Sequence, residues 1–282
     1  MEEDVVDGFY NPAQPASLRL RKLRPHPILS WPVDVPSRDP RGVESSANFE
    51  CWKKATASKK GIAGNYFSFK SGSVVACHSF LEFKLLRFFE MCPFVVEIRT
   101  QYPAWDREEY IRWAELGLAM PTRSVLTVDF MLTLRIPGQP GFIYHGVSGK
   151  PSVLVEEERV VRRHEREASR LECWGSSHEV MTELTIPNVE HENNRRLHSF
   201  MIHTKVEEIE SLTPHAEELA QKLQTTTVKG SLDRVLSMVS RRLGWELGMG
   251  YRLFGIANFL GYLKWDHRYE LRHYLPMKLK KD

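Results

Sequence analysis

Apolar and polar residues alternate most regularly over residues 126–134, where the sequence reads LTVDFMLTL. A period of two predicts a β-strand whose even-numbered residues face the core. Asp129 falls on the opposite face, together with Thr127, Met131 and Thr133. Charged residues are depleted from strands, and a desolvated carboxylate needs a partner or a metal ion. The pattern therefore marks Asp129 as a candidate functional residue on a strand face that borders a cleft rather than the core.

Short strands and helices alternate around this segment. A helix is predicted over 79–91, with Ser79 as its N-cap and Glu82 placed to complete a capping box. After the turn GQPG, residues 142–150 are predicted to return as the second strand of a hairpin. The other predicted elements are short strands between 65 and 77, a strand over 93–103, a charged helix over 156–174 and a strand over 178–184. This order predicts an α/β domain over residues 61–187, with a mixed sheet flanked by helices.

The last part of the chain, residues 188–282, is predicted to form a separate and mainly helical domain. The polar stretch TIPNVEHENNRR marks the boundary. Helical patterns follow over 213–225, 231–244 and 247–263, and residues 264–279 alternate as a short hairpin would. Three helices and a hairpin predict a helix-turn-helix or winged-helix module. Residues 1–60, rich in proline and basic residues, are predicted to be an extended arm with little core of its own.

Composition sets limits on function. The chain has 282 residues, 42% of them hydrophobic and 27% charged, and its net charge is only +3. These values are ordinary for a globular protein, and the overall charge does not indicate a nucleic-acid binder. Four scattered cysteines argue against a disulfide framework or a thiolate zinc site. The acidic start lacks a signal-peptide pattern and no apolar run is long enough to span a membrane, so we expect a cytoplasmic protein.

Three ionisable side chains are predicted to converge at one edge of the sheet. The hairpin brings Asp129 near Lys150. Glu82 shares a helix face with the apolar residues three, four and seven positions further on, so it points toward the sheet. Two carboxylates beside a lysine suit phosphodiester hydrolysis, since carboxylates bind Mg²⁺ or Mn²⁺ that activates water, and lysine stabilises the transition state.

Each of these residues also has an ordinary structural interpretation. Glu82 fits as the capping-box partner of Ser79 alone. Asp129 fits on a solvated strand face, and Lys150 fits as a surface lysine near a turn. His164 and Glu165 are predicted to lie on the solvated face of a charge-rich helix. Spacing alone leaves these interpretations open.

The order of the motifs resembles the catalytic domain of TnsA, the endonuclease subunit of heteromeric transposases in the PD-(D/E)xK nuclease superfamily. The similar segments are Ser68-Phe69-Lys70, Ser79 to Glu82, Val95 to Gln101, LTVDFML, GVSGK and SHEVMTEL. They span about residues 55–187, with a looser fit of the C-terminal domain. The resemblance implies a restriction-endonuclease-like core followed by a winged-helix-like domain.

The resemblance also implies roles for individual residues. Glu82 and Asp129 would be metal ligands, Lys150 the catalytic lysine, and Gln101 a supporting residue. Ser148 stands two positions before the lysine, where the family usually has Glu or Gln. The backbone carbonyl of Gly149 is therefore expected to supply a metal-binding oxygen.

The function implied is Mg²⁺-dependent cleavage of the non-transferred 5′ strand at transposon ends in a prokaryotic cell, with Mn²⁺ able to substitute. The implied partners are transposon-end double-stranded DNA, a TnsB-like transposase and a TnsC-like ATPase. Two alternatives stay open, namely a stand-alone PD-(D/E)xK nuclease of restriction or resolvase type and a non-catalytic DNA-binding assembly subunit. Basic clusters such as KKATASKK at 53–60 are candidate phosphate contacts, but the sequence assigns no DNA-binding residue.

Overall fold

The computed structural model describes residues 18–23, 28–45, 48–52 and 63–280. Their contacts divide the chain into two compact units. The first holds the described residues of 1–25, 35–85 and 94–185, and the second those of 26–34, 86–93 and 186–282. The candidate residues Glu82, Asp129 and Lys150 all belong to the first unit.

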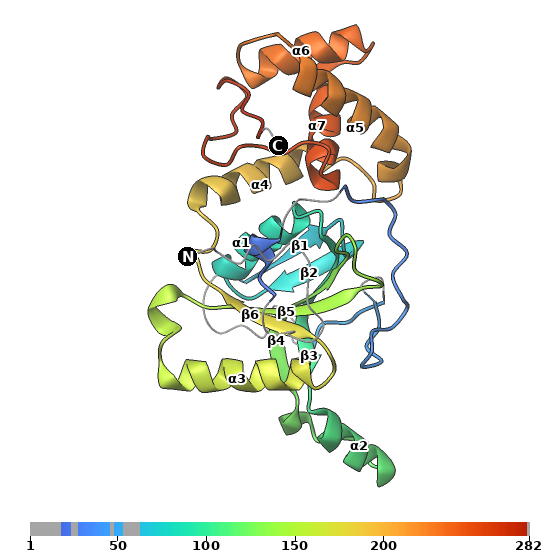
Figure 1. Ribbon diagram of the computed structural model, residues 1–282, viewed down its shortest axis with the longest axis vertical. Coiled ribbons are helices and arrows are strands. Elements are labelled where there is room, and N and C mark those ends of the chain that lie inside the picture. Colours follow the sequence, from blue (N-terminus) through green and yellow to red (C-terminus); the bar gives the residue numbers. More distant parts are fainter. Residues whose placement is uncertain (1–17, 24–27, 46–47, 53–62, 281–282) are drawn as a thin grey trace. The chain divides into compact units, whose positions relative to one another are not determined.

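A four-stranded mixed sheet forms the centre of the first unit (Figure 1). Its strands, in spatial order, are β3 (Val95–Ala104), β4 (Leu126–Leu134), β5 (Ile143–Gly149) and β6 (Ser177–Met181). The first three pair antiparallel, so the predicted hairpin of β4 and β5 is confirmed. Strand β6 runs parallel to β5, which requires a crossover, and α3 (Glu158–Glu172) supplies it.

Helices cover both faces of this sheet. A Cβ atom added to Gly146 would meet Leu171 of α3, whereas one added to Gly149 would meet Leu85 of α1 (Phe80–Glu90). Residues an odd number of positions apart on a strand point to opposite faces. The helices α1 and α3 therefore lie on opposite faces, and Figure 1 shows α3 along one of them. The predicted α/β class, a mixed sheet flanked by helices, is confirmed.

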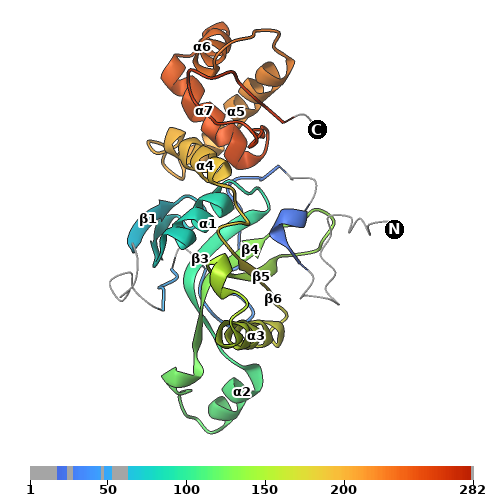
Figure 2. The same ribbon diagram turned by 90° about the vertical axis from the view of Figure 1, so that its left-hand side faces the viewer.

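Two smaller features complete the first unit. A separate antiparallel hairpin pairs β1 (Gly64–Ser68) with β2 (Ser73–Cys77), as expected. Helix α2 (Arg107–Glu115) was not predicted; Asp106 caps it, and none of its residues is buried. It projects away from the sheet (Figure 2), so it lacks the apolar stripe that marks a helix in a sequence. Short 3₁₀ turns occupy Leu20–Lys22, Thr122–Ser124 and Ser152–Leu154.

Strand β4 is buried on both faces except at Leu126 and Asp129, which are half-buried, whereas one whole cleft-facing side was predicted. Met131 and Thr133, expected beside Asp129 on that side, are 0% exposed. One apolar cluster also contains both Val128 and Met131, which strict alternation puts on opposite faces. The alternation is therefore interrupted near Asp129.

The described part of the predicted N-terminal arm contributes to cores. Leu20 is buried, and its N–H donates to the Glu179 carboxylate over 3.1 Å. Asp39 forms a 2.9 Å ion pair with Arg99, with 3% and 0% of the two side chains exposed. The Tyr102 hydroxyl also donates to Asp39. The prediction of an arm without a core is therefore wrong for these residues, whereas positions 1–17, 24–27, 46–47 and 53–60 lie outside the described residues.

The second unit is mainly helical. Its helices are α4 (Asn188–Phe200), α5 (Glu208–Thr225), α6 (Leu232–Arg242) and α7 (Leu247–Leu260). The last three match the predicted helical patterns. Helix α4 lies where a polar boundary was predicted, because its buried face includes His191, Asn193 and His198 as well as Leu197. Hydrophobic periodicity does not detect such a face.

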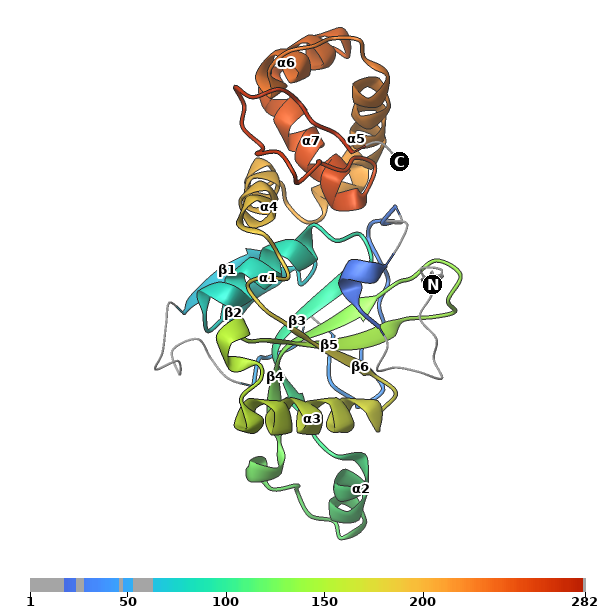
Figure 3. The same cartoon turned by 60° about the vertical axis from the view of Figure 1, so that its left-hand side comes forward.

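The segment after α7 does not form the predicted hairpin of strands. It makes isolated antiparallel bridges, Trp265 with Leu279 and Ser231 with Pro276, and runs beside α7 (Figure 3). Trp265 is buried and its ring contacts Phe254. Across the described ranges, no helix combines the length and apolarity that crossing a membrane requires.

The Asp39–Arg99 ion pair gives a direct test of the N-terminal segment. We expect Asp39→Ala to lower the free energy of unfolding by about 3–5 kcal/mol, because it leaves the Arg99 guanidinium buried with less compensation. Glu44→Ala is the matched control, because it breaks an exposed pair with Arg38 and should cost less than about 1 kcal/mol. Urea denaturation measures both. Equal, small losses would show that residues 35–45 do not belong to the core.

Candidate functional site

Asp129 lies on β4 beside the end of β5. The N–H of Gly149 donates to its carboxylate over 2.8 Å. The pKa of Asp129 is raised to about 7, first by burial and next by the negative charge of Glu82. The Gly149 N–H and the Lys150 ammonium oppose this rise. Asp129 therefore sits where a carboxylate is poorly solvated and close to another one.

Glu82 is held in the first turn of α1 by a capping box. Its N–H donates to Ser79 Oγ over 3.1 Å, and Ser79 Oγ donates back to the Glu82 carboxylate over 3.1 Å. The N–H of His78 reaches the other carboxylate oxygen over 2.8 Å. The contacts with Ser79 that a capping box requires are therefore present, but Glu82 also has a partner outside its helix. The carboxylate oxygen that accepts from His78 accepts a second, 3.1 Å hydrogen bond from the Gln101 amide on β3.

Lys150 directly follows β5, and its N–H donates to Met181 of β6 over 2.9 Å. Its positive charge lowers the pKa of both Glu82 and Asp129. Burial, the larger influence, raises the pKa of Glu82. The structure therefore brings together the three side chains that the sequence singled out. Gly149, expected to offer its carbonyl oxygen to a metal, is seen to use its N–H to bind Asp129.

Gln101 adopts an unusual backbone conformation at this point. The pairs Thr100–Phe130 and Tyr102–Val128 place it opposite Asp129 in the register of β3 and β4. Its φ is 50°, the only positive φ among the described non-glycine residues. This left-handed conformation costs about 1–2 kcal/mol for a residue with a Cβ atom. Such strain in a strand is characteristic of functional positions, and here it accompanies the amide contact with Glu82.

A buried polar network that the sequence did not reveal lies next to Asp129. Ser148 Oγ donates to Glu167 of α3 over 2.7 Å and lies 3.1 Å from His178 Nε2. Arg163 donates to the other Glu167 oxygen over 2.7 Å. The charge of Glu167 contributes to the raised pKa of Asp129. A third carboxylate therefore approaches the site from α3, although Ser148 replaces the acidic residue expected on β5.

The signal for Glu167 was present in the spacing of α3. Its buried residues are Val160, His164, Glu167 and Leu171, which recur at helical spacing on one face. His164 is thus buried rather than solvated as predicted, while Glu165 is exposed. Burial lowers the pKa of His178 to about 4, so this imidazole is neutral at neutral pH.

The residues present suit a hard divalent cation in kind. Glu82 and Asp129 supply carboxylate oxygens, the ligands that Mg²⁺ and Mn²⁺ take in proteins. A cation there would offset the burial that raises both pKa values and the Glu82 charge that adds to the rise at Asp129. Within the described ranges, however, no cluster of three or more His, Cys, Asp or Glu side chains is arranged to hold a metal ion. A site here would therefore be completed by main-chain oxygens, water or substrate.

Comparison with known proteins adds no family assignment. No protein-family model matches the chain, and no curated protein matches its sequence. The resemblance to TnsA therefore depends on the order of the motifs alone.

The raised pKa of Asp129 predicts a pH-dependent stability difference. Between about pH 4 and pH 7 the unfolded chain releases a proton that the folded chain keeps, so the wild type loses stability as the pH rises through this window. Asp129→Asn lacks this loss. We expect it to match the wild type near pH 4 and to be about 2–4 kcal/mol more stable at pH 8. Urea denaturation at both pH values, with exposed Asp34→Asn as control, tests this; a variant less stable than the wild type at pH 8 contradicts it.

The strain at Gln101 is testable with two variants. Gln101→Gly and Gln101→Ala both remove the amide contact with Glu82, and they differ only in a Cβ atom at φ 50°. We expect the glycine variant to be about 1 kcal/mol more stable in thermal unfolding. At Thr127, which has no positive φ, the same pair should show the opposite order. An alanine variant at 101 that equals or exceeds the glycine variant would exclude the strain.

Proposed function

We propose that the chain is a metal-dependent DNA endonuclease. The observation that carries this proposal is the pair of poorly solvated carboxylates, Glu82 and Asp129. Burial raises the pKa of both, and the positive charge of Lys150 opposes this rise in both. Structural carboxylates are normally paired so that their pKa falls, whereas carboxylates with raised pKa values cluster at functional sites.

In the proposed reaction each residue has a separate role. Glu82 and Asp129 would hold a divalent cation, which supplies a Lewis acid and an activated water. Lys150 would stabilise the negative charge that develops on the phosphate. Ser79, His78 and Gln101 would position Glu82, and the Gly149 N–H would orient Asp129.

The more specific part of the proposal follows from the motif order. It assigns the chain to TnsA-like, PD-(D/E)xK nucleases that cut the non-transferred 5′ strand at transposon ends in the prokaryotic cytoplasm. The second unit would be the winged-helix-like domain that contacts DNA or a partner. The partners would be a TnsB-like transposase and a TnsC-like ATPase. Because the nuclease would act only within this complex, the isolated chain would be inactive.

Cleavage of end-labelled transposon DNA by the reconstituted complex in Mg²⁺ tests this proposal. We expect Asp129→Ala and Lys150→Gln each to reduce 5′-strand cleavage at least about a hundredfold. Arg135→Gln, on an exposed arginine of the first unit outside α3, should cut normally. Unchanged cleavage by Asp129→Ala would refute the enzymatic assignment.

Two further readouts separate the possibilities. In calorimetric titrations with Mn²⁺, Asp129→Asn should weaken binding about tenfold or more, whereas Lys150→Gln should not, because it removes a positive charge. Cleavage by the chain alone, without transposase or ATPase, would favour a stand-alone nuclease and exclude the transposon-specific part.

A further inference from the structure

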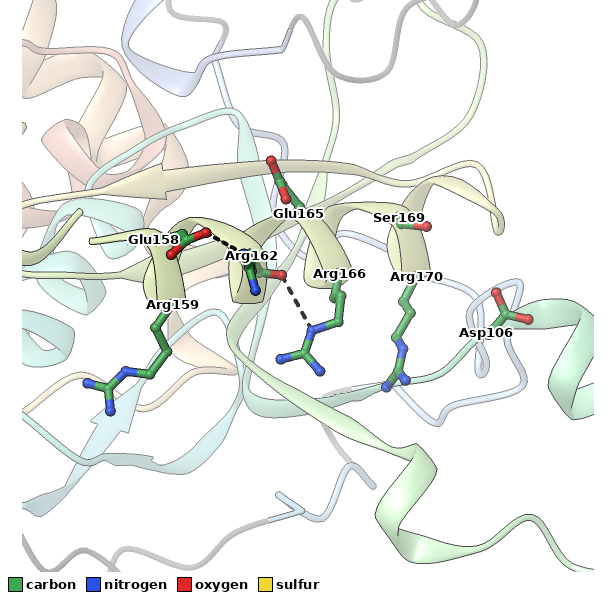
Figure 4. Close-up of a pocket in the computed structure, with 8 residues that line it drawn as sticks. All are labelled: Asp106, Glu158, Arg159, Arg162, Glu165, Arg166, Ser169 and Arg170. Atoms are coloured by element: carbon green, nitrogen blue, oxygen red, sulfur yellow. Dashed lines mark hydrogen bonds and ion pairs between the residues drawn. The ribbon is translucent and has the colours of Figure 1, made fainter. Parts of the chain in front are cut away.

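The exposed face of α3 carries a regular row of arginines. Arg159, Arg162, Arg166 and Arg170 recur at three- and four-residue intervals, which places them on one side of the helix. Together with Asp106, Glu158, Glu165 and Ser169 they line a groove of about 920 Å³. Figure 4 shows Arg159, Arg166 and Arg170 extending to the same side of α3, whereas Glu165 extends to the other.

Most of the row is not needed for the packing of the helix. The buried face of α3 is formed by Val160, His164, Glu167 and Leu171, none of which belongs to the row. Arg170 is half-buried, but Arg166 is exposed, and the Arg159 and Arg162 side chains are 90% and 70% exposed. These three exposed arginines therefore call for an explanation other than folding.

The charges of the row are available to a ligand. Among the described residues, the carboxylates that pair with Arg159 and Arg162 are those of Glu157 and Glu158, which are exposed, and exposed pairs contribute about 0–1 kcal/mol. Arg166 donates to the carbonyl of Arg162 over 3.4 Å, and Arg170 donates to that of Ser124 over 2.6 Å. Neither forms an ion pair with a described carboxylate. These backbone contacts orient the guanidinium groups without neutralising them.

The chemistry of the groove favours a polyanion with a regular repeat. At a rise of 1.5 Å per residue, Arg162, Arg166 and Arg170 are spaced about 6 Å apart along the helix axis. Arginine binds phosphate oxygens through two parallel hydrogen bonds. Every lining residue is charged or a serine, whereas protein interfaces have an apolar centre. A phosphodiester backbone fits these properties better than an acidic protein does.

The same helix connects the row to the candidate site. Arg163, next to Arg162, turns inward to Glu167 and also donates to the carbonyl of Thr127 over 3.3 Å, two residues before Asp129. Strand and helix are thus joined at that point.

We propose that the arginine row of α3 binds the phosphate backbone of double-stranded DNA. This inference depends on the proposed function only in taking DNA as the polyanion. It concerns binding, so its test contains no metal ion and needs no cleavage.

The test is fluorescence anisotropy of the full chain with a labelled 30-base-pair duplex in EDTA, from 50 to 300 mM salt. Arg159→Gln/Arg166→Gln should weaken binding and make the slope of log affinity against log salt shallower by about 2, or about 0.9 for each lost phosphate contact. The control, Arg38→Gln/Arg135→Gln, removes two exposed arginines of the first unit that lie outside α3 and should bind like the wild type. Circular dichroism verifies that both variants fold.

Each outcome is decisive. Equal slopes and affinities for the two double variants, or no binding by the wild type at 50 mM salt, would overturn the inference. A loss of binding to polyglutamate but not to DNA would assign the row to an acidic protein partner instead. DNA binding through the row by a chain that does not cleave transposon ends even in the reconstituted complex with Mg²⁺ would refute the proposed nuclease while leaving this inference standing.

Discussion

The proximity of Glu82 and Asp129 in a poorly solvated position is the constraint around which the first unit is organised. Burial opposes the ionisation of both carboxylates, and the charge of Glu82 further opposes that of Asp129. The groups that compensate come from separate parts of the chain, namely His78 and Ser79 before α1, Gln101 on β3, and Gly149 and Lys150 at the end of β5. The antiparallel order of β3, β4 and β5 brings these groups together. The strained φ of Gln101 fits this view, since its amide then reaches Glu82.

The surroundings of Ser148 explain why a serine occupies this position. Its hydroxyl donates to Glu167, which is 1% exposed and held by Arg163 from the other side. An acidic residue at 148 would place another carboxylate against a buried one, at a cost of several kcal/mol. The small hydroxyl instead lets α3 contribute the carboxylate. The carboxylate near Asp129 therefore comes from α3 rather than from β5, and the charge of Glu167 contributes to the raised pKa of Asp129.

Features with a local cause were the predictable ones. A capping-box pattern predicts the helix of Glu82. Alternation and a glycine-containing turn predict the hairpin of Asp129. What failed depended on distant partners. Nothing in the sequence around Asp39 marks it as a buried residue, because its partner Arg99 lies 60 positions away. Helix α4 buries histidines and asparagines, and α2 buries nothing, so neither shows a hydrophobic period. The alternation of β4 predicted two unlike faces, but helices on both sides of the sheet bury both.

Helix α3 illustrates how one element serves two purposes through its two faces. Its inner face carries Glu167 and His164 among apolar residues. This face is hard to recognise in the sequence because arginines dominate the composition of the helix. Its outer face carries the arginine row in a groove whose lining residues are charged or a serine. Because a helix is rigid over four turns, a ligand bound along the outer face has a defined position relative to the residues on the inner face. Arg163, between the two, bonds to Glu167 and to the strand of Asp129. Phosphate binding on the outer face of α3 would thereby fix the position of the DNA backbone relative to the carboxylates.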